Sequence, residues 1–150
     1  MRKDAAGSAT RRRIALGALA LVTVAIGLLV HRGVGGTIGD IAGDALYAAL
    51  IYLLVAVVAP RWHRLAVGAA AVAFCGGVEL LQLTGLPREW AAAFPPLELV
   101  LGSGFDARDL VVYAVAVTVA ALLDATVTVA VTGTRTGNAT GRPPEGERPV

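Results

Sequence analysis

Four long stretches of the chain carry almost no charge, and shorter segments rich in charge, glycine or proline separate them. The four stretches cover residues 14–30, 41–59, 65–86 and 110–131. A helix needs roughly 20 mostly apolar residues to cross a bilayer, so each stretch can be a span, and only the first is marginal in length. Because backbone groups in hydrocarbon must be hydrogen-bonded within their own segment, the pattern predicts an all-α, integral membrane four-helix bundle.

The amino-acid composition also indicates a membrane protein. Hydrophobic residues make up 56% of the 150 positions and charged residues only 16%, which is far from the balance of a soluble domain. The formal net charge is +2, but the basic side chains flank the apolar stretches instead of forming one patch. We therefore expect the lipid bilayer as a partner and no binding of nucleic acid.

Basic residues are distributed unevenly among the segments that separate the spans. Ten of them lie before the first span, between the second and third, or after the fourth: Arg2, Lys3, Arg11, Arg12, Arg13, Arg61, Arg64, Arg135, Arg142 and Arg148. Only Arg32, Arg88 and Arg108 lie in the two alternate segments. Since basic loops stay in the cytoplasm, we expect a multi-pass plasma-membrane protein, N-in/C-in, with residues 31–40 and 87–109 outside.

The two ends of the chain are expected to lie outside the bilayer. Residues 1–13 would form a basic cytoplasmic N-terminus, 14–131 the transmembrane domain, and 132–150 a disordered cytoplasmic tail. The first span also resembles a signal peptide, but His31 and Arg32 follow it where a small-residue cleavage site would stand. We therefore expect the first helix to be retained.

Two segments on the expected outer side have unusual compositions. Residues 33–39 contain four glycines and are predicted to form a flexible connector, because closely spaced glycines lose much backbone entropy on ordering. In the other segment, the apolar stretch 97–101 is too short to span a membrane. We expect it to lie at the interface or to dip into the bundle, as a partly embedded loop before the last helix. Trp90 and Phe94 suit the interfacial belt.

Glu79 is a carboxylate in a span that is otherwise almost entirely apolar or small. Ionisable side chains inside a span normally face a partner, a cavity or water, so Glu79 is a candidate functional residue. With the third span running outward, it lies seven residues from the expected end at residue 86, or about 10 Å. Asp44 and Asp109 begin the second and fourth spans on the same side. The three carboxylates predict one outward-facing acidic site.

Helical spacing adds two hydrogen-bonding residues to this candidate site. Gln82 lies three residues after Glu79, and Tyr113 lies four residues after Asp109. Residues three or four apart are neighbours on one face of a helix. We therefore expect Gln82 and Tyr113 to hydrogen-bond to the carboxylates.

Each of the three carboxylates also has a purely structural explanation. Asp44 and Asp109 would complement the dipoles at the starts of their helices, with Asp40 and Asp106 as the N-cap residues. Glu79 is too far from a helix start for that role. Its structural alternative is a protonated side chain that hydrogen-bonds to a neighbouring helix.

Two further charged residues are accessory candidates. Arg108 would be a counter-ion for the carboxylates or a clamp for an anionic headgroup, or else a solvated loop charge. Asp124 lies on the same stripe of the fourth span as Asp109, about 22 Å deeper. Its alternative is an interfacial residue near the cytoplasmic end, with its charge reaching headgroup water.

Few residues suit metal binding or nucleophilic catalysis. Cys75 is the only cysteine, and His31 and His63 are expected on opposite sides of the membrane. Neither histidine has a second ligand at metal-binding spacing, so we expect no metal and no cofactor. Since neither histidine lies on a span, no nucleophile and base are paired, and the sequence leans against an enzyme without deciding the question.

Three segments of the chain, taken in order, resemble a known pattern. They are Gly43-Asp44-Ala45-Leu46-Tyr47, then Glu79-Leu80-Leu81-Gln82-Leu83, then Leu101-Gly102-Ser103-Gly104-Phe105 with Asp109, Leu110 and Tyr113. They resemble a bacterial membrane family catalogued as domain of unknown function 2809. The sequence departs from that family at Tyr47, where Trp is more usual, and at Ala116, where Gly is. The layout is also distantly similar to VanZ-like envelope proteins, which are associated with glycopeptide resistance without an agreed reaction.

These observations leave three functions open. The first is a small inner-membrane protein of uncharacterised activity, whose acidic site binds or acts on an envelope or lipid-linked molecule. The second is a proton- or cation-coupled transporter or channel subunit, which would have to be a homo-oligomer because four spans without an inverted repeat are few for a monomer. The third is a structural assembly partner whose acidic residues only fix the register of the helices.

Overall fold

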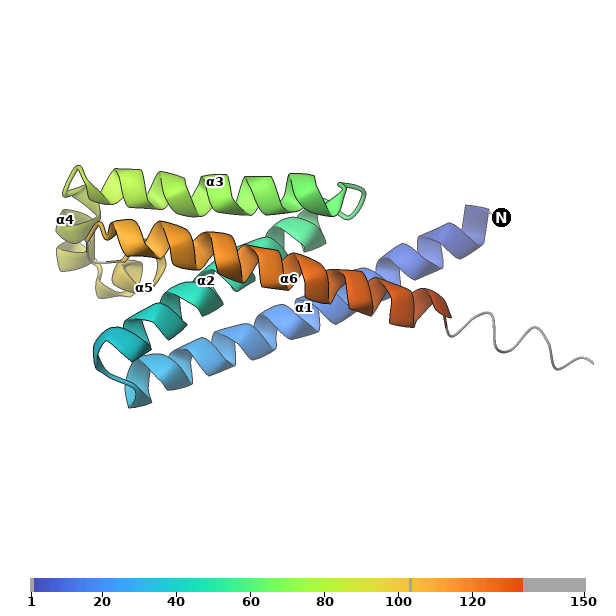
Figure 1. Cartoon of the computed structure of the whole chain (residues 1–150), viewed down its shortest axis with the longest axis horizontal. Helices are drawn as coiled ribbons and strands as arrows, with labels where there is room; N and C mark the ends of the chain where they lie inside the picture. Colours follow the sequence, from blue (N-terminus) through green and yellow to red (C-terminus); the bar gives the residue numbers. More distant parts are fainter. Residues whose placement is uncertain (1, 103, 134–150) are drawn as a thin grey trace, which may run out of the picture.

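Four long helices make up most of the structure, a computed structural model that describes residues 2–102 and 104–133 (Figure 1). They are α1 (Arg2–Gly33), α2 (Gly36–Val58), α3 (Arg64–Gln82) and α6 (Ala107–Gly133). Each contains a segment long and apolar enough to cross a membrane. The predicted all-α, four-span architecture is therefore confirmed, and the protein is a multi-pass membrane protein.

The connection between α3 and α6 forms three short helical pieces. They are α4 (Leu86–Ala93), the 3₁₀-helix η1 (Pro95–Leu97) and α5 (Glu98–Leu101). Figure 1 shows them together at one end of the bundle, beside the end of α3 and the start of α6. The predicted tail, 132–150, lies outside the described residues except for 132–133, which end α6.

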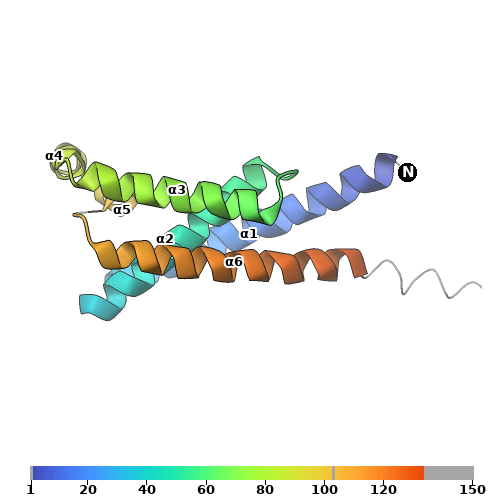
Figure 2. The ribbon, with the colours of Figure 1, turned by 45° about the horizontal axis from the view of Figure 1, so that its top comes forward.

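Helices α2 and α6 form the centre of the bundle, because each packs against all the other long helices. Figure 2 shows the hairpin of α1 and α2 crossing the pair of α3 and α6 at an angle. The core between them contains many small side chains, namely Ala48, Ala56, Ala71, Cys75 and Ala120. Small residues let helix backbones approach closely. This close packing drives helix association in a bilayer, because the lipid is as apolar as the side chains.

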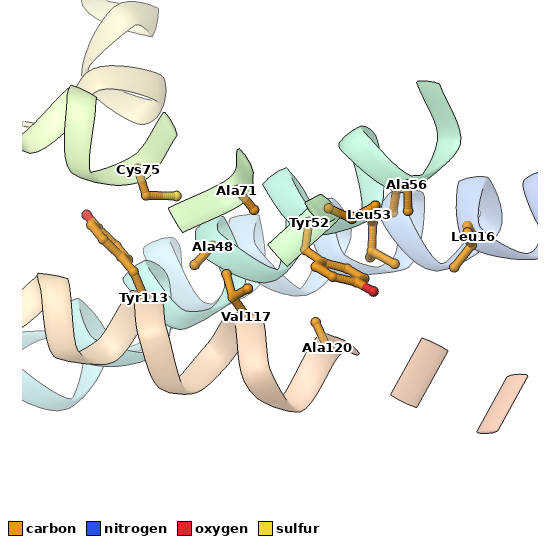
Figure 3. Packing of buried hydrophobic residues seen from close by; sticks show 12 residues of the cluster. Leu16, Ala48, Tyr52, Leu53, Ala56, Ala71, Cys75, Tyr113, Val117 and Ala120 are labelled. Atoms are coloured by element: carbon orange, nitrogen blue, oxygen red, sulfur yellow. The ribbon is translucent and has the colours of Figure 1, made fainter. Parts of the chain in front are cut away.

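Two buried tyrosines are the largest side chains in this core. Tyr52 on α2 is fully buried and Tyr113 on α6 nearly so. In Figure 3 their hydroxyl groups point away from each other, Tyr113 toward the α4 end of the bundle and Tyr52 toward the opposite end. Buried tyrosine hydroxyls need hydrogen-bond partners, so each tyrosine marks a polar cluster at one end of an apolar core.

Helix α3 ends earlier than the sequence analysis predicts. It stops at Gln82 instead of residue 86, because Gly85 adopts a left-handed conformation with φ of 78° and Pro87 begins a new helix direction. The predicted distance of Glu79 from the end of its helix is therefore wrong. Glu79 lies three residues from the end of its helix, about 4.5 Å instead of about 10 Å.

The glycine-rich segment 33–39 is mostly helical, so the prediction of a flexible connector is wrong. Helix α1 runs to Gly33 and α2 already begins at Gly36. A Cβ atom on Gly39 would lie only 2.1 Å from the carbonyl oxygen of Val34, so glycine allows the close turn between the two helices. Packing of the hairpin here outweighs the low helix propensity of glycine.

This early start of α2 also corrects the predicted role of Asp40. The residue lies inside the helix, and Gly35 occupies the N-cap position. Asp44 is then eight residues beyond the first helical residue, in the third turn. Because the helix dipole acts only within the first turn, it does not explain Asp44. The other predicted cap is confirmed: the Asp106 carboxylate accepts a hydrogen bond of 2.8 Å from the backbone N–H of Arg108.

Candidate functional site

Glu79 lies at the centre of a polar cluster at the α4 end of the bundle, which we call the acidic end. Its side chain is buried, with only 1% of the residue exposed. The Tyr113 hydroxyl donates a hydrogen bond of 2.7 Å to Glu79 Oε1, and the backbone N–H of Asp106 donates one of 3.3 Å to Oε2. Glu79 thus joins α3 to the first two turns of α6 and to the segment that precedes α6.

Asp44 and Asp109 complete a group of three carboxyls contributed by α2, α3 and α6. Asp109 is buried and Asp44 half-buried. Asp44 lies close enough to Asp109 and to Glu79 for its carboxyl group to interact electrostatically with both. The structure therefore brings the three acidic residues of the candidate site together.

Arg108 lies at the solvent-exposed edge of this group. Its Nε atom is 3.6 Å from Asp109 Oδ1, and its Nη2 atom is 3.2 Å from Asp106 Oδ2. The Arg108 side chain is 40% exposed, so these contacts are weakened by solvent. Arg108 offsets part of the negative charge of the site while keeping donors toward the surroundings.

Tyr47, which the sequence analysis noted only as a departure from the family pattern, also lies at the acidic end. Its ring centroid lies 6.4 Å from that of Tyr113, with a tilt of 56° between the rings. Its hydroxyl is buried and has no hydrogen-bond partner among the described residues. Since Tyr47 lies three residues after Asp44 on α2, helical spacing was a signal that could have placed it in the site.

Gln82 has a different partner from the one predicted. Its Nε2 atom donates a hydrogen bond of 2.6 Å to the Leu101 carbonyl and so holds α5 against the end of α3. Gly102 must be glycine for this contact, because its φ is 68° and a Cβ would lie 2.4 Å from Gln82 Nε2. Leu99 and Val100 on α5 are 51% exposed, and whether they enter the bilayer stays a prediction.

A half-open groove of about 400 Å³ lies next to Gln82. It is lined by Gln82, Leu83, Gly85, Pro87, Arg88, Gly104 and Phe105. Phe105 immediately precedes Asp106, whose backbone N–H contacts Glu79, so the segment that lines the groove continues directly to the acidic group. The groove combines the Arg88 guanidinium with apolar side chains and with backbone that glycines leave uncovered.

Several buried polar atoms at the acidic end have no hydrogen-bond partner within the described part of the chain. They are Tyr47 Oη, Gln82 Oε1 and Asp109 Oδ1. Buried polar groups in native structures are nearly always hydrogen-bonded to protein or water, so three such atoms at one end require an explanation.

A family model described as "Protein of unknown function (DUF2809)" matches residues 35–117, more than half of the chain. The chain belongs to this family. The predicted membership is therefore confirmed, and the matched residues include Asp44, Glu79, Asp109 and Tyr113. The chain matches none of the curated proteins and none of the solved structures with which it was compared.

A second polar cluster lies at the opposite end of this DUF2809 protein, which we call the basic end. Asp124 is buried there, with 2% exposed. Arg12 donates a hydrogen bond of 3.1 Å from Nε to Asp124 Oδ1 and another from Nη2 to Oδ2. The Tyr52 hydroxyl donates to Oδ2 at 3.1 Å, and Arg64 Nε lies 3.6 Å from the same atom.

These contacts correct the interpretation of Asp124 as an interfacial residue whose charge reaches headgroup water. The carboxylate is buried because α1, α2 and the start of α3 meet over it, and Arg12 neutralises it. The sequence analysis treated Arg12 and Arg64 only as topology signals. The sequence did contain a signal for this cluster, because the uneven distribution of basic residues predicts that both arginines and Asp124 lie near the same side of the membrane.

The two clusters of the DUF2809 protein do not connect through the described side chains. The core between them is built from apolar residues, among them Ala48, Ala71, Val117 and Ala120. In the described ranges, no group of three or more His, Cys, Asp or Glu residues has a geometry that could hold a metal ion. The side chains at each end offer hydrogen-bond donors and acceptors and charge.

Proposed function

We propose that the acidic end of this DUF2809 protein binds the polar headgroup of an envelope or lipid-linked molecule. The observation that carries the proposal is a set of three buried polar atoms at this end of the bundle that have no hydrogen-bond partner among the described residues. One of them, Gln82 Oε1, belongs to a residue that lines the groove. A purely structural acidic site would be expected to satisfy its own buried atoms. Binding is the function that these atoms support best, and we assign no reaction.

The residues around the groove suggest the chemistry of the ligand. Arg88 offers guanidinium donors, which match phosphate oxygens. Gln82 Oε1 is an acceptor on the groove and Asp109 Oδ1 is an acceptor in the neighbouring acidic group, and both match hydroxyl or amino groups of a sugar or amino alcohol. Exposed apolar side chains such as Leu83 and Phe105 would lie against an acyl or prenyl chain. A sugar phosphate linked to a lipid combines all three kinds of group.

The test uses the full-length protein purified from bacterial membranes in mild detergent. Lipids that copurify are quantified by mass spectrometry for the wild type, Arg88→Gln and Arg32→Gln. Arg32→Gln is the control, because it removes one positive charge from the other segment that is expected outside the membrane. We expect a lipid with a sugar-phosphate headgroup to be retained by the wild type and the control and to fall about tenfold in Arg88→Gln, the effect of one charge-assisted contact. Equal lipid content in all three proteins would contradict the proposal.

We also propose that the acidic end faces outward, with both termini in the cytoplasm, on the basis of the uneven distribution of basic residues. Reporter fusions after Arg32, Arg64, Trp90 and Gly137 should read outside, inside, outside and inside. A reversed pattern would place the groove in the cytoplasm. The ligand would then have to be a molecule of the inner leaflet instead of an external precursor.

Transport of protons or cations is the second candidate that the sequence left open. A path across the membrane would have to link Glu79 to Asp124. The described side chains between them include Ala48, Ala71 and Val117, which cannot carry a proton. This core favours the binding function over transport through a single copy of the chain.

A further inference from the structure

The basic end of the bundle contains a second groove, of about 540 Å³. It is lined by Arg12, Pro60, Trp62, His63, Arg64 and Leu65. It lies where the connection from α2 to α3 passes the start of the apolar part of α1. Because α3 begins at Arg64, this groove is at the boundary between the apolar spans and their connecting segment. It is separate from the acidic end and is not part of the function proposed above.

The charge of this groove is positive although Asp124 is present. Arg12 and Arg64 share the single carboxylate of Asp124, so one positive charge remains. The neighbouring segments 10–14 and 60–65 contain five arginines and no acidic residue. An anion that enters the groove therefore meets a net attraction.

Hydrogen-bond donors also remain in the groove. Arg12 uses three of its five N–H groups, two toward Asp124 and one toward the Pro60 carbonyl. Arg64 Nε is buried and has no hydrogen-bond partner among the described residues, since 3.6 Å to Asp124 is too long for a hydrogen bond. Asp124 fixes both guanidinium groups while leaving donors for a second anion.

The other residues of the groove indicate a lipid as the source of that anion. The Trp62 side chain is 54% exposed and Leu65 is 79% exposed. Tryptophan is enriched at the level of lipid headgroups, and an exposed leucine beside it offers a surface for an acyl chain. A soluble phosphate would use the arginines but not these two side chains.

We propose that this groove binds the phosphate of an anionic membrane phospholipid, with Arg64 and Arg12 as donors and Trp62 and Leu65 against the acyl chains. Basic pockets between transmembrane helices are known to hold such headgroups. The bound lipid would cover the site where α1, the α2–α3 connection and α6 meet. The ligand is thus a bulk membrane lipid, unlike the headgroup proposed for the acidic end.

The chain contains only two tryptophans, which allows a direct test. In full-length Trp90→Phe protein, Trp62 is the sole tryptophan and reports on the groove by fluorescence. The protein is placed in phosphatidylcholine vesicles with a minor fraction of phosphatidylglycerol, with bromine on the acyl chains of one lipid or the other. We expect brominated phosphatidylglycerol to quench Trp62 with about tenfold higher relative affinity than brominated phosphatidylcholine.

Three variants of the Trp90→Phe protein test whether Arg64 causes the preference for phosphatidylglycerol. Arg64→Gln should abolish the preference, and Arg64→Lys, which keeps the charge but loses the Nε donor, should reduce it strongly. Arg13→Gln, which changes an exposed arginine outside the groove, should keep it. Equal losses in Arg13→Gln and Arg64→Gln would mean nonspecific attraction and overturn the proposal, as would the absence of any preference. Removal of the preference by inorganic phosphate, against chloride at equal ionic strength, would indicate a soluble anion and also overturn it.

Discussion

Arg12→Met is expected to lower the free energy of unfolding by about 3–5 kcal/mol, because it leaves a buried carboxylate without its main partner. The Asp124 side chain is fully buried and that of Arg12 is 15% exposed, so solvent cannot replace the lost contact. Arg64 is too distant and too exposed to compensate. The measurement is thermal unfolding of the detergent-solubilised full-length protein.

A second substitution distinguishes charge burial from loss of packing. Arg12→Met combined with Asp124→Leu removes both charges and should recover most of the lost stability, since a buried ion pair replaced by apolar groups is often nearly neutral. Tyr52 would then lack its acceptor, at a cost of about 1 kcal/mol. Arg13→Met is the matched control on the exposed face of α1 and should change little. If Arg12→Met is no less stable than this control, the ion pair does not hold α1 in place.

Glu79→Gln is expected to abolish function while changing stability by less than about 1 kcal/mol. The amide oxygen can accept from the Asp106 N–H, and the amide NH₂ group can donate to the Tyr113 oxygen. Both hydrogen bonds of Glu79 are therefore replaced in the variant. The variant cannot present a negative charge or exchange a proton. We would measure membrane abundance, melting temperature and the phenotype of a deletion strain under cell-envelope stress.

The controls for Glu79→Gln follow from the structure. Tyr113→Phe removes the hydrogen bond to Glu79 but keeps the carboxylate, and should retain more function than Glu79→Gln. Glu98→Gln alters an exposed acid on α5 and should be neutral, whereas Asp106→Ala should lose about 1 kcal/mol with the cap of α6 and keep function. Full rescue of the phenotype by Glu79→Gln would leave the carboxylate with only a structural role.

The spans could be predicted because each is a long apolar run, but the exact ends of the helices could not. Helix α3 ends at Gln82 although apolar Leu83 and Leu86 follow, since Gly85 and Pro87 decide the backbone direction there. The start of α2 at Gly36 depends on the contact between Gly39 and Val34 in the hairpin. Such contacts form only in the folded structure, so they cannot be predicted from the helix propensities of the residues.

The acidic end could be anticipated from positions on single helices, because Asp44 on α2, Glu79 on α3 and Asp109 on α6 lie near the same end. The partner of Asp124 could not, because Arg12 lies 112 residues away in the sequence. Gln82 shows that a position on a helix can be predicted when the hydrogen-bond partner cannot. Its position one turn from Glu79 was predictable, but its hydrogen bond to Leu101 depends on the path of the α4–α5 connection.

The ion pair between Arg12 and Asp124 joins the first long helix to the last, and this has a consequence for biosynthesis. At ordinary rates of translation, Asp124 is made about 10 s after Arg12. During that interval α1 lacks the partner that neutralises Arg12, so α1 must be held by its packing against α2 alone. The synthesis of α6 then closes the bundle, and a nascent chain that stops before Asp124 would present an unclosed α1 to membrane quality-control proteases.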